Sequence, residues 1–123
     1  MIDFITTQYR TQFGPVEAWR DEVLAVGREN GVAVSFAINP IDGGTRIPGC
    51  PRGPTQGDGT YGRNCRMTAA QVLESGSTLG VAGCALFIWR YDTVFMSDPD
   101  NEAAFREIGA KLADRQAPPC RRH

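Results

Sequence analysis

This chain of 123 residues has a single histidine, almost no net charge and no long apolar run. The one histidine is His123, the last residue, so catalytic systems that need a positioned imidazole are not expected. The net charge is −1, which gives no electrostatic reason to expect nucleic acid or an anionic membrane as a partner. No apolar run of about 18 residues occurs, so no membrane-spanning segment is expected.

Metal and redox motifs are also missing, because the four cysteines form no Cys-x-x-Cys pair. A structural zinc site, a thioredoxin-type motif and any cofactor are therefore not expected. An even number of cysteines in a small chain instead favours disulfide bonds and a secreted or extracellular location. No signal peptide follows Met1, so we expect the chain to be a mature form or a piece of a longer secreted precursor.

Length and composition predict one globular domain over residues 1–123, since 41% of the residues are apolar and 22% are charged. Alternating strand and helix patterns predict strands over residues 2–7, 32–39 and 81–91. Helices are expected from Pro15 to Asn30-Gly31, from a Thr68 cap to about Ser75 with a stop at Gly76, and from Ser97 or Asp98 to before Pro118. The order predicts an α/β fold of three successive βα units with a parallel sheet.

Apolar side chains recur in stripes that identify the buried faces of the expected helices. Val16, Trp19, Val23 and Val26 form the stripe of the first helix. Ala104, Phe105, Ile108 and Leu112 form the stripe of the last helix.

The second expected strand has a bulky and a small side. Val32, Val34, Phe36 and Ile38 alternate with Ala33, Ser35, Ala37 and Asn39. The bulky side suits packing against helices. The small side fits either the crowded interior of a barrel or a parallel strand that is buried on both faces.

Residues 40–67 form a long stretch rich in glycine and proline, which predicts an irregular loop. It contains Cys50 and Cys65. A disulfide bond between them would raise the free energy of unfolding by about 3 kcal/mol. Cys84 precedes the third strand and Cys120 follows the helix that returns to the same end. We therefore expect the local pairs Cys50–Cys65 and Cys84–Cys120 rather than crossed ones.

Two strand segments and the C-terminal cysteine resemble a known family. Residues 37–44 are similar to a strand-end LNxLDGG segment, and residues 83–92 to a GCALxxWxYD final strand. With Cys120-Arg121-Arg122 they resemble the C-terminal part of secreted bacterial glycoside-hydrolase-like proteins with a (β/α)8 (TIM) barrel. The resemblance covers nearly the whole chain but only the last three βα units, so the first five have no counterpart here.

Sites in parallel α/β proteins gather at the carboxyl ends of the strands. Asp42 and Asp92 are the only acids expected there, so they are the candidate catalytic pair of a glycoside hydrolase. As alternatives, Asp42 builds a turn before two glycines and Asp92 pairs with an arginine. The candidate substrate-binding residues supply rings for stacking and polar groups for hydroxyls: Tyr9, Arg10, Asn39, Trp89, Arg90 and Tyr91.

The leading functional hypothesis is a carbohydrate-active, glycoside-hydrolase-like protein that acts on an extracellular polysaccharide or glycoside. The alternatives are a non-catalytic sugar-binding or assembly module, and an inactive barrel fragment that needs a partner chain. Three parallel strands leave two open sheet edges, so we also expect a homo-oligomer that covers them.

Overall fold

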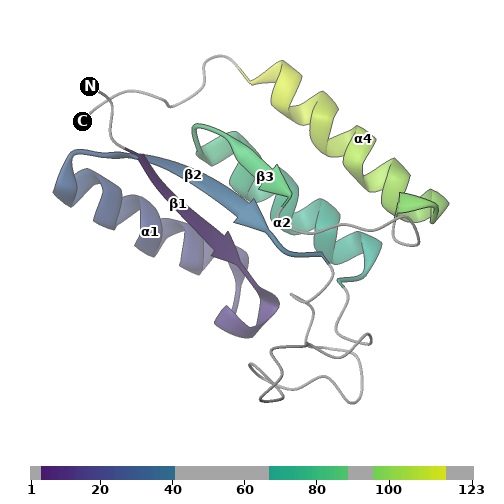
Figure 1. Ribbon diagram of the computed structural model, residues 1–123, viewed down its shortest axis with the longest axis horizontal. Coiled ribbons are helices and arrows are strands. Elements are labelled where there is room, and N and C mark those ends of the chain that lie inside the picture. Colours follow the sequence, from purple (N-terminus) through teal and green to yellow (C-terminus); the bar gives the residue numbers. More distant parts are fainter. Residues whose placement is uncertain (1–3, 41–66, 89–95, 116–123) are drawn as a thin grey trace.

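The computed structural model describes residues 4–40, 67–88 and 96–115, and in these ranges strands alternate with helices as the sequence predicts (Figure 1). The elements, in chain order, are β1 (Phe4–Tyr9), the short 3-10 helix η1 (Thr11–Phe13), α1 (Val16–Asn30), β2 (Ala33–Ile38), α2 (Ala69–Ala82), β3 (Leu86–Ile88) and α4 (Pro99–Asp114).

The strands form one parallel sheet with β2 between β1 and β3. The register pairs Tyr9 with Ile38 and Ile38 with Ile88, so residues in the same row share a face of the sheet. The predicted α/β class with three successive βα units is therefore confirmed.

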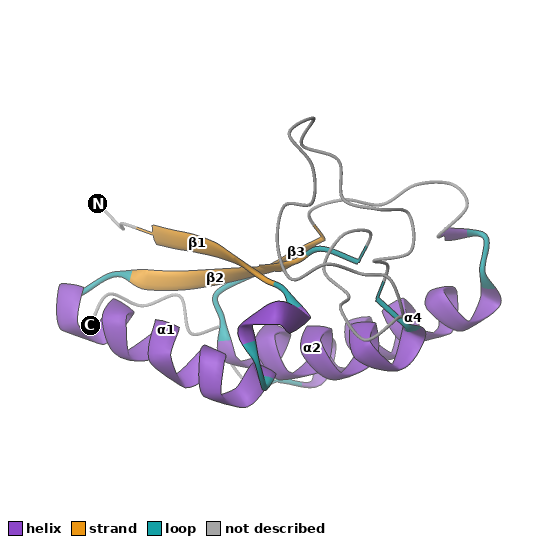
Figure 2. Ribbon diagram, turned by 90° about the horizontal axis from the view of Figure 1, so that it is seen from below, coloured by secondary structure: helices purple, strands orange, loops and turns teal. Residues whose placement is uncertain are grey.

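The long helices that the structure describes, α1, α2 and α4, lie on one face of the sheet. In Figure 2 the strands form an upper layer, and α1, α2 and α4 form a second layer beneath them. We call the face turned away from these helices the open face. Sequential parallel strands with their helices on one side are the arrangement that right-handed βα crossovers produce.

The alternation along β2 separates the two faces as the sequence predicts. Phe36 points toward the helices, where its ring lies 5.7 Å from that of Trp19 in α1. Val34 and Ile38 belong to the same buried core cluster, together with Val72 and Leu79 from α2. The small residues of β2 face the open side. All six residues of β2 are buried, so the strand is covered on both faces.

Helix α1 ends where the sequence predicts, because Gly31 adopts a left-handed conformation with φ of 65° and caps it. The predicted apolar stripe needs one correction, since Val26 is 47% exposed. Gly27 takes its place in the packing: a Cβ atom there would lie 2.6 Å from Val34 Cγ2. The absent side chain at Gly27 brings α1 close to β2, and this turns Val26 outward.

Helix α2 is longer than the sequence predicts. The Thr68–Gln71 capping box is confirmed, because Thr68 N–H donates to Gln71 Oε1 and Gln71 N–H donates to Thr68 Oγ1. The stop at Gly76 is wrong, since the helix continues to Ala82. Gly76 and Gly80 lie on the side that packs against α4, where added Cβ atoms would meet Ile108 and Leu112. Tertiary packing thus outweighs the low helix propensity of glycine.

The third strand begins later than expected, because Val81 and Ala82 belong to α2 and β3 starts at Leu86. Its predicted end, residues 89–91, lies outside the described residues. Helix α4 begins as predicted: Asp98 Oδ1 accepts from Asp100 N–H, and Pro99 occupies the first turn. Its buried residues include Ala104 and Ile108 of the predicted stripe, and Phe105 and Leu112 are partly buried against the core.

Pro40 and Met67 bracket the long Gly/Pro-rich stretch and lie next to each other. Met67 N–H donates to Pro40 O over 2.7 Å. The chain therefore returns, at the start of α2, to the point where it left the carboxyl end of β2. The intervening residues 41–66 lie outside the described part of the chain.

Candidate functional site

Three polar side chains meet at the carboxyl ends of β1 and β2, and we call Gln8, Arg10 and Asn39 the carboxyl-edge cluster. Gln8 Oε1 accepts hydrogen bonds from Arg10 Nε at 3.1 Å and from Asn39 Nδ2 at 3.2 Å. Asn39 is only 1% exposed, whereas Gln8 and Arg10 are half-buried. Gln8 Oε1 therefore links the end of β1 to the end of β2 by accepting from both Arg10 and Asn39.

The strand register explains why these residues meet. Gln8 pairs with Ala37, and Asn39 follows two positions later on the same face of β2. Parallel strands end at the same edge of a sheet, so polar residues at the ends of β1 and β2 lie side by side. Arg10 comes directly after β1 and reaches back to Gln8. The cluster lies on the open face.

Of the predicted substrate-binding residues, Arg10 and Asn39 are brought together by the structure. Gln8 joins them, although the sequence places it beyond the predicted end of the first strand. Because β1 in fact extends to Tyr9, Gln8 faces the same side as Asn39. The sequence shows that Gln8 precedes Arg10 by two residues. Only the register of the two strands shows that Gln8 lies opposite the small residue Ala37.

Tyr9 does not belong to this cluster. It occupies the adjacent position of β1, so its side chain points to the helix side, where it is 4% exposed. Its hydroxyl donates to Gly14 O at 2.5 Å, and its ring lies 5.2 Å from that of Trp19. Its assignment to substrate binding therefore does not fit the structure, because the ring is a core side chain that offers no surface for stacking.

The remaining site candidates lie outside the described residues. These are the proposed catalytic pair Asp42 and Asp92 and the substrate-binding candidates Trp89, Arg90 and Tyr91. Every described aspartate and glutamate lies in α1, α2 or α4, or caps α4. Within the described ranges, no group of three His, Cys, Asp or Glu side chains is placed to hold a metal ion.

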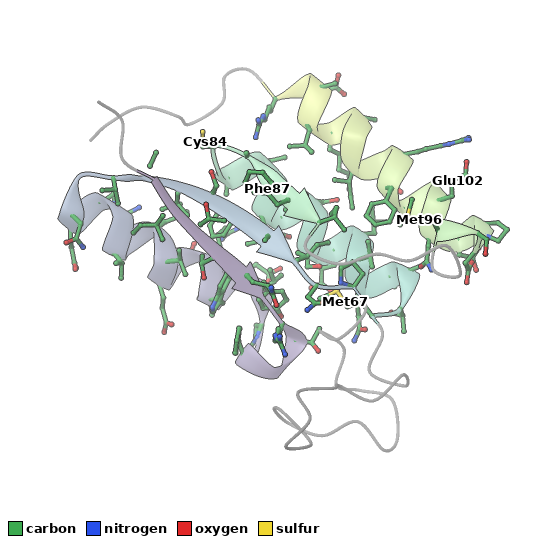
Figure 3. All side chains as sticks on the ribbon, viewed as in Figure 1. Met67, Cys84, Phe87, Met96 and Glu102 are labelled. Atoms are coloured by element: carbon green, nitrogen blue, oxygen red, sulfur yellow. The ribbon has the colours of Figure 1, made fainter. Side chains whose placement is uncertain are left out.

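Cys84 lies at the amino end of β3, at the other end of the sheet from Met67 and the carboxyl-edge cluster (Figure 3). Its backbone N–H donates to Val34 O over 2.7 Å. Cys84 is disulfide-bonded. Cys50, Cys65 and Cys120 lie outside the described residues, so the predicted Cys50–Cys65 and Cys84–Cys120 pairs stay predictions.

Two surface hollows lie on the helix side, and neither is lined by the carboxyl-edge cluster. The smaller encloses about 50 Å³ and is bordered by Tyr9, Pro15 and Ser75 among others. The larger, of about 640 Å³, is a shallow groove over the helices, where Arg20, Ser77 and Lys111 contribute to its lining.

Comparison with protein-family models, with curated proteins and with solved structures finds no match to this chain. In the part of the chain that the structure describes, no helix is both long and apolar enough to span a membrane.

Proposed function

We propose that this chain is a carbohydrate-active, glycoside-hydrolase-like protein that binds a polysaccharide or glycoside outside the cell at the carboxyl edge of its sheet. The observation that carries the proposal is the carboxyl-edge cluster. Amide and guanidinium groups of Gln8, Arg10 and Asn39 gather there in a hydrogen-bonded arrangement on the open face. Such groups recognise sugar hydroxyls, and the carboxyl ends of parallel strands are where α/β proteins bind ligands.

The layer arrangement supports the same proposal. Three consecutive parallel strands with every described helix on one face match three successive βα units of a (β/α)8 barrel. In such a barrel the helix-free face is the interior, and active sites lie at the carboxyl ends of the strands. The open face and the carboxyl-edge cluster correspond to those two features.

For catalysis we propose Asp42 and Asp92, each of which follows a strand. In a glycoside hydrolase one carboxyl protonates the leaving oxygen while the other acts as nucleophile or activates water. Asp42 comes two positions after the described Pro40, and Asp92 four positions after the last residue of β3. Both therefore follow strands that end at the same edge of the sheet.

The test is hydrolysis of a panel of polysaccharides, followed as released reducing ends. We expect Asp42→Asn and Asp92→Asn each to lower the rate by about 100-fold or more, because each removes a proton-transfer or nucleophilic group. Asp21→Asn is the matched control, since Asp21 is exposed on α1 and pairs there with Arg20. Hydrolysis that survives both site substitutions would show that these carboxylates are not the acid and base.

A non-catalytic sugar-binding module is the second candidate. Two observations on the described residues favour it. The side chains at the carboxyl edge of the sheet carry amide and guanidinium groups. The described carboxylates lie in the helices or cap α4. The two candidates separate cleanly: a module binds an oligosaccharide without cleaving it, and Asp42→Asn and Asp92→Asn leave that binding in place.

We further propose that the chain associates with itself, or with a partner chain, through the edges of its sheet. In the described part of the structure, β1 and β3 are each paired on one side only. A strand edge carries unpaired N–H and C=O groups that favour addition of another strand.

A further inference from the structure

We propose that Gln8 and Phe87, which lie on the open face on either side of β2, form a sugar-binding subsite. The inference rests on the proposed function, since it names side chains through which the same edge of the sheet holds a carbohydrate. Gln8 pairs with Ala37, and Ala37 pairs with Phe87, so the three stand in one row across the sheet. Two strand spacings, about 10 Å, separate the outer two.

The hydrogen bonds of Gln8 fix which end of its amide faces a ligand. Arg10 Nε–H can only donate, so the atom of Gln8 at 3.1 Å from it is the acceptor Oε1. Asn39 Nδ2 donates to the same oxygen. Within the described part of the chain, Gln8 Nε2 donates to no protein acceptor. The amide therefore offers its N–H groups, in a fixed orientation, to an oxygen of the ligand.

Phe87 supplies the apolar half of the subsite. Phe87 lies on β3 (Figure 3), and its side chain is 49% exposed. Its neighbours Leu86 and Ile88 pack against the core. Ala37 between the two strands is 2% exposed, so contact with a ligand falls to the side chains on either side of it. An exposed ring beside an oriented amide suits the apolar face and the hydroxyl groups of a sugar ring.

An exposed phenylalanine on a sheet face also suits a second copy of the chain. The oriented donor favours a sugar instead. An apolar protein surface that covered the row would bury the N–H groups of Gln8 without an acceptor, which is unfavourable. A hydroxyl-rich ligand satisfies the ring and the amide together.

The experiment is isothermal titration of the full chain with cellohexaose, xylohexaose, mannohexaose and chitohexaose. Gln8→Glu keeps acceptor oxygens for Arg10 and Asn39 but removes the N–H donors, so we expect affinity for the bound hexasaccharide to fall about 3- to 10-fold. Phe87→Leu keeps an apolar side chain but removes the ring, and we expect a fall of similar size.

Two matched controls accompany these variants. Gln71→Glu makes the same charge change at an amide that serves the helix cap, and it keeps an acceptor for Thr68 N–H. Phe13→Leu removes a ring that is 53% exposed on η1. Neither control should change the affinity. If Gln8→Glu does not fold, the Gln8 side-chain amide signal in the NMR spectrum of the unaltered protein replaces it, and we expect this signal to shift on addition of the sugar.

The possible outcomes are distinct. If no hexasaccharide binds the unaltered chain, the proposed function fails and the subsite fails with it. If a hexasaccharide binds but both site variants bind like their controls, or the Gln8 amide signal does not move, only the subsite is overturned. If Phe87→Leu leaves sugar affinity unchanged and weakens self-association in sedimentation velocity, the row is an interface between copies.

Discussion

At the scale of single residues, the close approach of α2 and α4 depends on Gly76. A Cβ atom at this position would lie 2.4 Å from Ile108 Cδ1 and 3.1 Å from Ile108 Cγ1. Ile108 is 3% exposed, so its side chain has little room to move aside. The lack of a side chain at Gly76 is therefore a packing requirement rather than a stop signal for the helix.

We expect Gly76→Ala to lower the free energy of unfolding by about 1–3 kcal/mol, because overpacking outweighs the gain in helix propensity. Gly109→Ala on α4 is the matched control, since a Cβ atom there meets nothing within 4 Å. It should raise stability by up to about 1 kcal/mol. Urea unfolding of both variants measures the difference. Equal effects of the same sign would contradict the close approach, and Ile108→Val should relieve part of the loss.

Tyr9 illustrates how one position along a strand decides a role. Its neighbour Gln8 faces the open side, whereas Tyr9 is buried among Trp19 and Phe13 and donates to Gly14 O. We expect Tyr9→Phe to lower the free energy of unfolding by about 1 kcal/mol through the lost hydrogen bond, and to leave sugar affinity unchanged. Thermal unfolding and titration calorimetry measure the two effects. If the variant lost sugar affinity while its stability stayed unchanged, Tyr9 would have to contribute to sugar binding.

At the scale of elements, Arg115 connects the end of α4 to the end of α2. Its guanidinium donates to Gly80 O, to Gly83 O at 3.0 Å and to Cys84 O at 3.3 Å. These carbonyls lie at the C-terminal end of α2 and just beyond it, where a positive charge also interacts favourably with the helix dipole. One side chain thereby holds the last turn of α2, the start of the segment leading to β3, and the end of α4 in place.

Replacement of Arg115 by alanine should lower the free energy of unfolding by about 1–3 kcal/mol, because three carbonyls lose a charged donor. Arg106→Ala is the control: Arg106 pairs with Glu102 in α4 but is 79% exposed, so its loss should change stability by less than about 0.5 kcal/mol. Chemical denaturation of both proteins gives the comparison. Similar small effects would mean that Arg115 does not join the two helices.

The sequence predicts the identity and order of the elements well, because the signals are local. The capping box at Thr68, the Asp98 cap and the Gly31 stop all act within one helical turn. The length of α2 was not predictable in the same way. Gly76 lowers local helix propensity, and only contact with Ile108 on a distant helix shows why a glycine is needed there.

The candidate site was predictable only in part, for a related reason. Residue types at strand ends place Arg10 and Asn39 at the carboxyl edge, where the structure brings them together, but which side of the sheet each side chain faces depends on register. Strand β1 ends at Tyr9, two residues later than predicted. Within the strand, Gln8 faces the open side and Tyr9 faces the helices. Phe87 belongs to an apolar run, and its exposure follows from the one-sided placement of the helices.

At the scale of the whole molecule, the sheet keeps two outer edges for further contacts, because in the described part of the chain β1 and β3 are each paired on one side only. A three-stranded parallel sheet of this kind is more commonly part of a larger closed or covered sheet. We expect sedimentation equilibrium to give a native mass at least twice the chain mass of 13.4 kDa. A stable species at 13.4 kDa, at every concentration tested, would contradict self-association.

The central claim is that the open face at the carboxyl edge of the sheet binds carbohydrate. A crystal structure of the chain with the best-bound hexasaccharide tests it most directly. The account predicts sugar density on the open face, with a hydroxyl accepting from Gln8 Nε2 and a ring against Phe87. Sugar seated instead in the groove over the helices, beside Arg20 and Lys111, would contradict it.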